Sequence, residues 1–195
     1  MRITRVALIM WTAAAAAYGR EAPQKLTLAL RMGAADRLVL MPLAQDVASK
    51  MFAKVGIELE WKAGKRTEFE QPAILVEVVS DTPPAFRPGV LGYARFEDTS
   101  VRVFLDRIEE FECSAIVLAH VLVHEITHVL QSIGRHSGSG VMKAEWSRRD
   151  YAEMRHRPLP FAAEDVDLIA RALSSRTSRA AGLPALTTTI DNKTN

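Results

Sequence analysis

The segment from Cys113 to Ile133 is predicted to form one long helix that is apolar on almost every side. A helix of this kind is normally buried in a core. Its apolar positions are Ile116, Val117, Leu118, Val121, Leu122, Val123, Ile126, Val129 and Leu130. The same segment also contains His120, His124, Glu125 and His128. Buried polar side chains are costly without a partner, so this helix requires something that satisfies them.

The composition fits one ordinary globular domain. The chain has 195 residues, of which 48% are hydrophobic and 25% charged, and it shows no internal repeat. Its net charge of +2 comes from scattered basic residues, so we expect no nucleic-acid-binding surface. We expect a monomer. Cys113 is the only cysteine, which excludes an internal disulfide and leaves stability to a packed core, a metal or both. Cys113 is expected to be buried.

The N-terminus is typical of a secretion signal. Arg2 and Arg5 precede an apolar run from Val6 to Ala17 that is rich in alanine. This run is shorter than the roughly 20 residues of a membrane-spanning helix. We therefore expect a signal peptide at residues 1–22, a secreted or periplasmic protein, and no stable membrane span. The alternative is an N-terminal helix that remains attached as an anchor.

The rest of the chain alternates between strand and helix patterns. Strands are expected at 25–32, 57–61, 74–79, 90–96 and 100–105, with 74–79 central and 90–96 at an edge; helices are expected at 35–55, 113–133 and 161–173. The helix at 35–55 begins with Asp36 as a candidate cap, and Pro42 would kink it or delay its start.

This order predicts an α+β fold. A mixed twisted sheet with an edge strand packs against the 113–133 helix and a backing helix, followed by a small C-terminal subdomain that ends in a helix. A single domain would span 23–175, with subdomains at about 23–134 and 135–175, and 176–195 would form a flexible tail.

His124, Glu125 and His128 form the pattern His-Glu-x-x-His. Residues four apart lie on one helix face, about 6 Å apart along the axis, so two imidazoles can converge on one ion. Zn²⁺ suits imidazole ligands, and a catalytic zinc keeps one position for water. Glu125 is then placed to take a proton from that water. His120 lies one turn earlier, where it would ligate, donate a hydrogen bond to a ligand or face solvent.

The segment after the helix resembles the metzincin metallopeptidases. It contains Gly134 and His136, followed by Gly-Val-Met-x-Ala at 140–144. The resemblance implies that Gly134 ends the helix, that His136 is the third zinc ligand, and that Met142 lies in a turn forming the hydrophobic floor beneath the ligands. It also implies a zincin-like fold, in which extended substrate pairs with the edge strand at 90–96. The spacing differs from the family pattern. Gly134 is six residues after His128 instead of three, and His136 is eight after it instead of six.

This longer spacing leaves the third ligand open. Three more helical residues would move the turn about 4.5 Å along the axis. His136 can return to the metal only if the helix ends early, near Leu130, or if the loop folds back. In a gluzincin-like arrangement an acidic residue would serve instead. The candidates are Glu145, Asp150, Glu153, Glu164 and Asp165.

These observations predict a zinc-dependent endopeptidase that hydrolyses peptide bonds in a protein or peptide substrate. The proposed site comprises Glu125 as general base and His124, His128 and His136 as ligands. Tyr151 is a candidate for stabilising an oxyanion, although packing is the more common role. The alternative class is a non-catalytic, exported zinc-binding or scaffold protein. A degenerate enzyme would be expected to lose Glu125 first.

Overall fold

A computed structural model describes residues 23–33, 40–65, 68–69 and 72–180. The predicted signal peptide and the candidate cap Asp36 lie outside these residues. The strands are β1 (Gln24–Met32), β2 (Ile57–Ala63), β3 (Ile74–Val79), β4 (Gly92–Arg95) and β5 (Ser100–Phe104). The helices are α1 (Met41–Ala53), α2 (Leu105–Ile108), α3 (Ser114–Gln131), α4 (Arg148–Met154) and α5 (Ala163–Ala180).

The five strands form one sheet in the order β2-β1-β3-β5-β4. The pairs β1–β2, β1–β3 and β3–β5 are parallel, and β4 pairs with β5 in the antiparallel sense. The α+β fold with a mixed sheet is therefore confirmed. The run Ile74–Val79 is the central strand, and β4 is an edge strand, as its short alternating pattern predicts.

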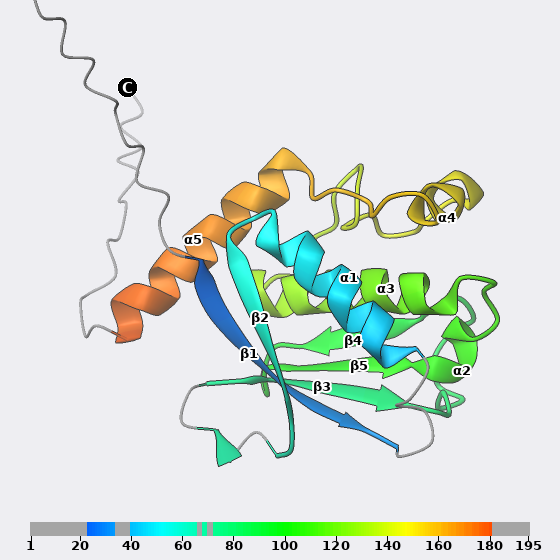
Figure 1. Ribbon diagram of the computed structural model, residues 1–195, viewed down its shortest axis with the longest axis horizontal. Helices are drawn as coiled ribbons and strands as arrows, with labels where there is room; N and C mark the ends of the chain where they lie inside the picture. The colour runs from blue at the N-terminus through cyan, green and yellow to red at the C-terminus, as the bar shows by residue number, and fades with distance from the viewer. Residues whose placement is uncertain (1–22, 34–39, 66–67, 70–71, 181–195) are drawn as a thin grey trace, which may run out of the picture.

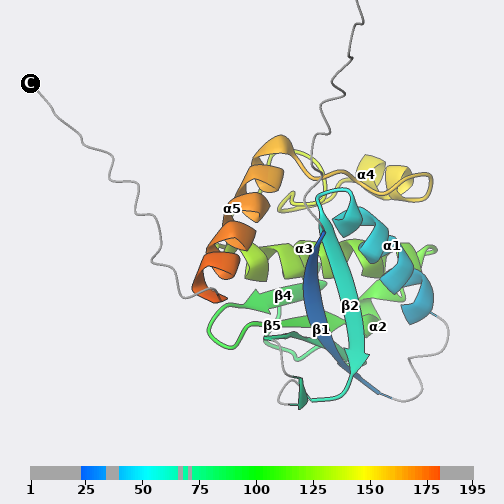
Figure 2. The same ribbon diagram turned by 60° about the vertical axis from the view of Figure 1, so that its left-hand side comes forward.

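Helices α1 and α3 lie side by side on one face of the sheet, and the core lies between these two layers (Figure 1). Figure 2 shows the same layering from another direction, with α5 near the C-terminal end of α3. The apolar residues of α3 from Val117 to Leu130 are buried, which confirms its predicted place in the core. Within the described part of the chain, α3 also has the length and composition of a membrane span, but 78% of it is buried inside the protein.

The start of α1 confirms one of the two outcomes predicted for Pro42, a delayed start of the helix. The helix begins at Met41, and Pro42 lies in its first turn. Proline is tolerated there because the first backbone N–H groups of a helix have no partner within the helix. Pro42 therefore sets the beginning of the helix and does not kink it.

Two features of the C-terminal part were not expected. Helix α4 lies in a segment that lacks apolar periodicity, and a capping box between Ser147 and Asp150 begins it. Helix α5 extends to Ala180, beyond the helix predicted at 161–173 and into the segment 176–195 predicted as a tail. The hydroxyls of Ser174 and Ser175 donate to the carbonyls of Ala170 and Arg171 at 3.0 and 2.9 Å. A helix end can therefore continue without an apolar face.

Candidate metal centre

The structure brings three histidines together. The nearest ring nitrogens of His124, His128 and His136 all lie within 4.8 Å of one another. His124 and His128 come from adjacent turns of α3, and their Nε2 atoms are 3.0 Å apart. The ring of His136 lies 5.2 Å from that of His124 and 4.9 Å from that of His128, between centroids. Among the described residues, these three form the group of His, Cys, Asp or Glu side chains that is close enough to hold one ion.

The hydrogen bonds of the helical pair leave two lone pairs facing each other. His124 Nδ1 lies 2.9 Å from the carbonyl oxygen of Val141, and His128 Nδ1 lies 3.0 Å from that of Ile133. A carbonyl only accepts, so both Nδ1 atoms carry the proton and both Nε2 atoms are bare in the neutral rings. Two bare nitrogens at 3.0 Å cannot form a hydrogen bond with each other. A cation between them satisfies both.

The protonation state and spacing of the pair also fit zinc. Burial lowers the pKa of His124 to about 4, against the opposing effect of its hydrogen bond to Val141. Burial likewise lowers the pKa of His128. Both rings are therefore neutral near pH 7, as metal binding requires. Two nitrogens at about 2.0–2.1 Å from a tetrahedral zinc would be about 3.3 Å apart, close to the separation of the pair.

The early end of α3 explains how His136 reaches this pair despite its distance along the chain. The helix ends at Gln131, and Ser132 adopts a left-handed conformation with φ of 54°. The resemblance assigned this turn to Gly134, and that expectation is wrong, because Gly134 is not among the residues with positive φ. Since the helix ends one residue after Leu130, the chain turns back early enough for His136 to meet the other two histidines.

A buried carboxylate anchors the loop on both sides of His136. Asp165 lies in the first turn of α5 and is fully buried. Its Oδ1 accepts a hydrogen bond from the Ser137 hydroxyl at 2.6 Å and lies 3.3 Å from Nη1 of Arg135. Its Oδ2 accepts from the backbone N–H of Ala162 at 3.2 Å. The residues before and after His136 are thus tied to the start of the last helix.

The Gly-Val-Met segment closes the site from the other side. Gly140 has φ of 73°, and a side chain there would collide with the carbonyl oxygen of Pro160. The Val141 carbonyl accepts from His124 and also from Nε1 of Trp146, at 3.3 Å. This turn therefore orients one of the helical histidines.

Met142 follows in the same turn and is fully buried. Its carbonyl oxygen accepts a hydrogen bond from the backbone N–H of Ser137 at 2.8 Å. The turn and the His136 loop are thus joined by main-chain contact. The position of Met142 is compatible with the floor that the resemblance implies.

Glu125 lies in a cleft next to the histidines. The cleft has a volume of about 650 Å³, and His124, Glu125 and His136 are among its lining residues. Burial raises the pKa of Glu125 to about 8, although a hydrogen bond from the backbone N–H of Ala94 opposes this shift. A nearby cation would favour the carboxylate, because an opposite charge stabilises the ionised form.

Strand β4 borders the cleft through Gly92 and packs against α3. The Phe104 N–H donates to the Leu91 carbonyl at 2.9 Å, which makes these two residues a hydrogen-bonded pair of the antiparallel ladder. Because such pairs alternate with non-bonded ones, the main-chain groups of Gly92 and Ala94 point away from β5. A side chain at Gly92 would lie 3.1 Å from Val121 and 3.4 Å from Glu125. Its absence lets the edge strand pack directly on α3.

Three of the acidic alternatives lie outside the histidine group. Glu164 is exposed and pairs with Arg135 at 2.7 Å, which lowers the pKa of Glu164. Glu145 is exposed and lines the cleft, but it does not belong to the group of potential ligands. Asp165 instead binds Ser137 and Arg135, the neighbours of His136.

The remaining acidic candidates have structural partners. Asp150 caps α4 through Ser147 and pairs with Lys143 at 2.5 Å. Glu153 pairs with Arg157 one turn later, at 2.8 Å. Neither carboxylate belongs to the histidine group. On this geometry, His136 is the better candidate for the third ligand.

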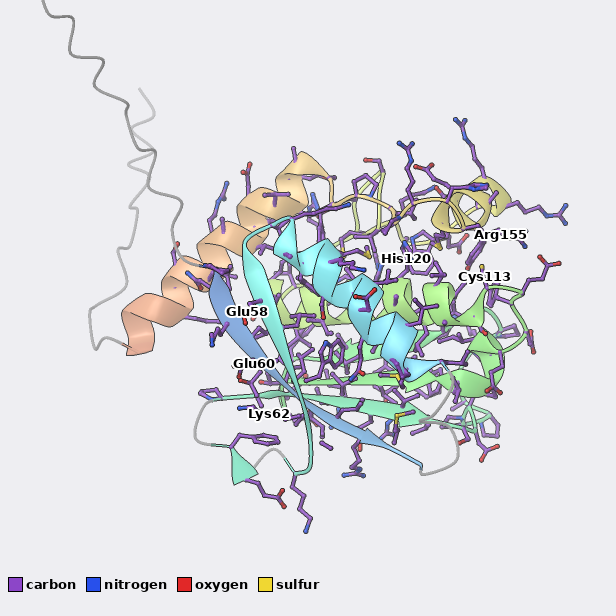
Figure 3. The ribbon with its side chains drawn as sticks, in the orientation of Figure 1. Glu58, Glu60, Lys62, Cys113, His120 and Arg155 are labelled. Atoms are coloured by element: carbon purple, nitrogen blue, oxygen red, sulfur yellow. The ribbon has the colours of Figure 1, made fainter. Side chains whose placement is uncertain are left out.

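His120 has none of the three roles expected of it. It is fully buried; its Nδ1 donates to the Ile116 carbonyl at 2.7 Å, and its Nε2 accepts from the Leu159 N–H at 3.0 Å. Figure 3 shows His120 on the side of α3 beneath the chain that connects α4 and α5. It joins the C-terminal subdomain to the core helix. Cys113, at the N-terminal end of α3, is half-buried, not fully buried as expected.

Aromatic residues also lie beside the site, and no sequence motif marks their position there. The ring of Trp146 lies 5.7 Å from that of His124 and meets it edge to face. Tyr151 lines the cleft, and its ring stacks on Phe111 with centroids 4.8 Å apart. This stacking supports a packing role for Tyr151.

Comparison with solved structures identifies the fold. Archaemetzincin from Methanopyrus kandleri matches with a TM-score of 0.54 and 17% sequence identity, over 80% of this chain and 99% of that one. No protein-family model matches the chain, and no curated protein matches it. The chain therefore shares the fold of archaemetzincin, which agrees with the zincin-like fold predicted from the sequence.

Proposed function

We propose that this protein is an exported, zinc-dependent endopeptidase. The observation that carries this proposal is the convergence of three imidazoles, two of which point bare Nε2 atoms at each other across 3.0 Å. That arrangement is unfavourable in the protein alone and favourable around a cation. The fold shared with archaemetzincin supports the same conclusion, and in this chain His124 and His136 line a cleft.

His124, His128 and His136 would hold the zinc. A bound zinc ion would supply a Lewis acid that polarises a carbonyl oxygen and lowers the pKa of a water molecule. Glu125 would act as general base and then as general acid, because it lines the same cleft as His124 and His136. The N–H of Ala94 would hold that carboxylate in place.

The substrate is proposed to be an extended protein or peptide segment. Gly92 and Ala94 direct main-chain groups away from β5, at the open edge of the sheet, and Gly92 also lines the cleft. An added strand can pair with such groups whatever its side chains are. Since the N–H of Ala94 already bonds to Glu125, the groups of Gly92 and the carbonyl of Ala94 remain for this pairing.

Export rests on the sequence pattern of residues 1–22 alone. We propose a secreted or periplasmic protein that acts as a monomer. N-terminal sequencing of the mature protein, recovered from outside the cytoplasm of an expressing bacterium, tests this point. A chain that keeps Met1 would contradict cleavage.

Metal content and proteolysis, measured on the same preparations, test the proposed activity. We expect about one zinc per chain and hydrolysis of casein by the wild-type protein. Glu125→Gln should retain zinc and lose activity by at least about 100-fold, the usual scale for removing a general base. Glu153→Gln is the matched control, since Glu153 pairs with Arg157 on α4.

Zinc binding without cleavage, unchanged in Glu125→Gln, would instead indicate a non-catalytic zinc-binding protein. Absence of stoichiometric zinc in the wild-type protein would overturn both readings. Loss of zinc in Glu125→Gln would show that the glutamate supports the metal and would contradict its assigned role.

A further inference from the structure

We propose that the short helix α2 is a clamp that positions the substrate-binding rim of the cleft, with Arg107 as its principal positioning residue. The rim is defined as residues 86–91, which precede β4. This inference rests on the proposed function, because it concerns how the same cleft receives a peptide. It adds two residues, Asp106 and Arg107, that no sequence motif marks.

Arg107 binds the main chain of the rim at three points. Its Nη1 donates to the carbonyls of Arg87 and Val90, both at 2.6 Å, and its Nη2 donates to the carbonyl of Phe86 at 3.0 Å. A guanidinium group presents several N–H donors in a rigid, planar fork. One side chain therefore holds the rim near both ends.

Asp106 secures the chain just before the rim. Its Oδ2 accepts from the Thr82 N–H at 3.1 Å, and its Oδ1 accepts from the Thr82 hydroxyl at 2.8 Å. Neighbouring residues of α2 thus bind two places along one loop. The loop contains Pro83, Pro84 and Pro88, which cannot donate backbone hydrogen bonds of their own.

The clamped segment is part of the cleft. Residues 87–92 all line it, opposite His124 and Glu125. The rim continues directly into β4, the strand proposed to pair with substrate. Because β5 runs without interruption into α2, the clamp is also tied to the strand that pairs with β4.

This arrangement would reduce the entropy cost of substrate binding. A loop that is already ordered in the free protein loses less freedom when a peptide pairs with it. A second anchor competes with this explanation: Phe86 stacks on Tyr93 and meets Phe104 edge to face, with centroids 5.0 and 4.8 Å apart. The experiment must therefore separate the guanidinium from the aromatic contacts.

Ligand binding to the zinc-loaded protein makes this separation. The two probes are N-acetyl-trileucyl hydroxamate, which extends along the cleft, and acetohydroxamate, which reaches only the metal. Arg107→Ala and Arg107→Lys should weaken binding of the peptidyl probe about 10-fold and of acetohydroxamate less than about 2-fold, as expected from lost preorganisation. The matched control is Arg157→Ala, which removes an exposed arginine that pairs with Glu153 on α4.

Hydrogen exchange provides a readout that does not depend on catalysis. In Arg107→Lys, the amides of Val90 and Leu91 should exchange faster, while those in the centre of α3 should not change. Unchanged exchange at these amides, or equal weakening of both probes, would overturn the clamp. If the wild-type protein binds neither hydroxamate, the proposed function fails, and the exchange measurement still decides whether Arg107 orders the rim.

Discussion

The two halves of the histidine cluster are built in different ways. His124 and His128 lie on adjacent turns of a buried helix, and each residue is 8% exposed or less. His136 lies in a segment without regular structure and is exposed. The helical pair is aligned by the geometry of one turn. The third histidine is positioned by contacts with α5 and with the turn at Met142.

This difference indicates which part of the site affects folding stability and which part affects metal affinity. The helix buries Glu125 together with the pair, so it must tolerate polar groups in the core. The loop buries little, but it depends on Asp165 and Ser137 for its path. We therefore expect changes on the helix to alter stability and changes in the loop to alter metal affinity.

The largest effect is expected from removing the loop ligand itself. His136→Ala should weaken zinc binding by on the order of 100- to 1000-fold, because each ligand of a four-ligand site contributes roughly 3 kcal/mol. Glu164→Ala removes the rival carboxylate beside the same loop and should leave the affinity nearly unchanged. Competition with a chelator measures both. Equal affinities in the wild type and the His136 variant would point to an acidic ligand.

On the helix, Glu125→Gln should stabilise the metal-free protein. The folded-state pKa of Glu125 is raised from 4.5 to about 8, so between these values the folded protein binds one proton more than the unfolded chain. The unfolding free energy of the wild type then falls as pH rises, by about 1.4 kcal/mol per pH unit. The variant should be more stable by about 3 kcal/mol at pH 7 and equally stable below pH about 4.5.

Urea unfolding of the metal-free proteins at pH 4, 7 and 8.5 checks this sign. The advantage of the glutamine variant should grow with pH, and zinc should reduce it because the cation favours the carboxylate. Glu153→Gln, at a partly exposed ion pair, should show no such growth. A constant difference across the pH range would contradict the cost assigned to the buried carboxyl group.

A smaller effect is expected at the anchor of the loop. Asp165→Asn keeps the shape of the side chain but weakens its bonds to Arg135 and Ser137, and zinc affinity should fall by about 10-fold. The same substitution in the His136→Ala background should have almost no further effect on affinity, because the anchored ligand is already gone. Full additivity of the two changes would show that Asp165 acts only on overall stability.

The smallest effect concerns the turn between the two halves. Ser132 carries a positive φ that glycine adopts more readily, so Ser132→Gly should stabilise the protein by about 0.5–1 kcal/mol. Gly134→Ala should be tolerated, because nothing lies within 4 Å of the added methyl group and φ is not positive. Thermal unfolding measures both. Destabilisation by Gly134→Ala would indicate that Gly134, and not Ser132, makes the turn after α3.

Much of the fold was readable from local patterns. The alternation at 57–61, the β-branched run Ile74–Val79 and the apolar surface of α3 all depend on how a residue packs against neighbours in the same element. Helix α4 was missed because its signal is a cap between Ser147 and Asp150 and not a periodic face. For α1 the sequence left two outcomes for Pro42, and the helix starts late because proline is tolerated in the first turn.

Local spacing likewise predicts one part of the site and not the other. The convergence of His124 and His128 follows from helical spacing, and the place of Glu125 between them follows with it. The fate of His120 does not, because its partner, the Leu159 N–H, lies in a distant segment. The contacts of Asp165 and Arg107 likewise cannot be predicted from local patterns, because each residue joins elements that are far apart along the chain.

By itself, then, the sequence determined the helix, the pair of imidazoles on one of its faces, and the need for a partner to satisfy them. Only the tertiary structure decided whether a histidine eight residues further along meets that pair. It does so because α3 ends at Gln131 and Ser132 turns the chain, while Asp165 and the Val141–Met142 turn hold the returning loop. Local spacing fixes geometry within a turn of helix; a loop takes its path from contacts with other elements, which no local pattern encodes.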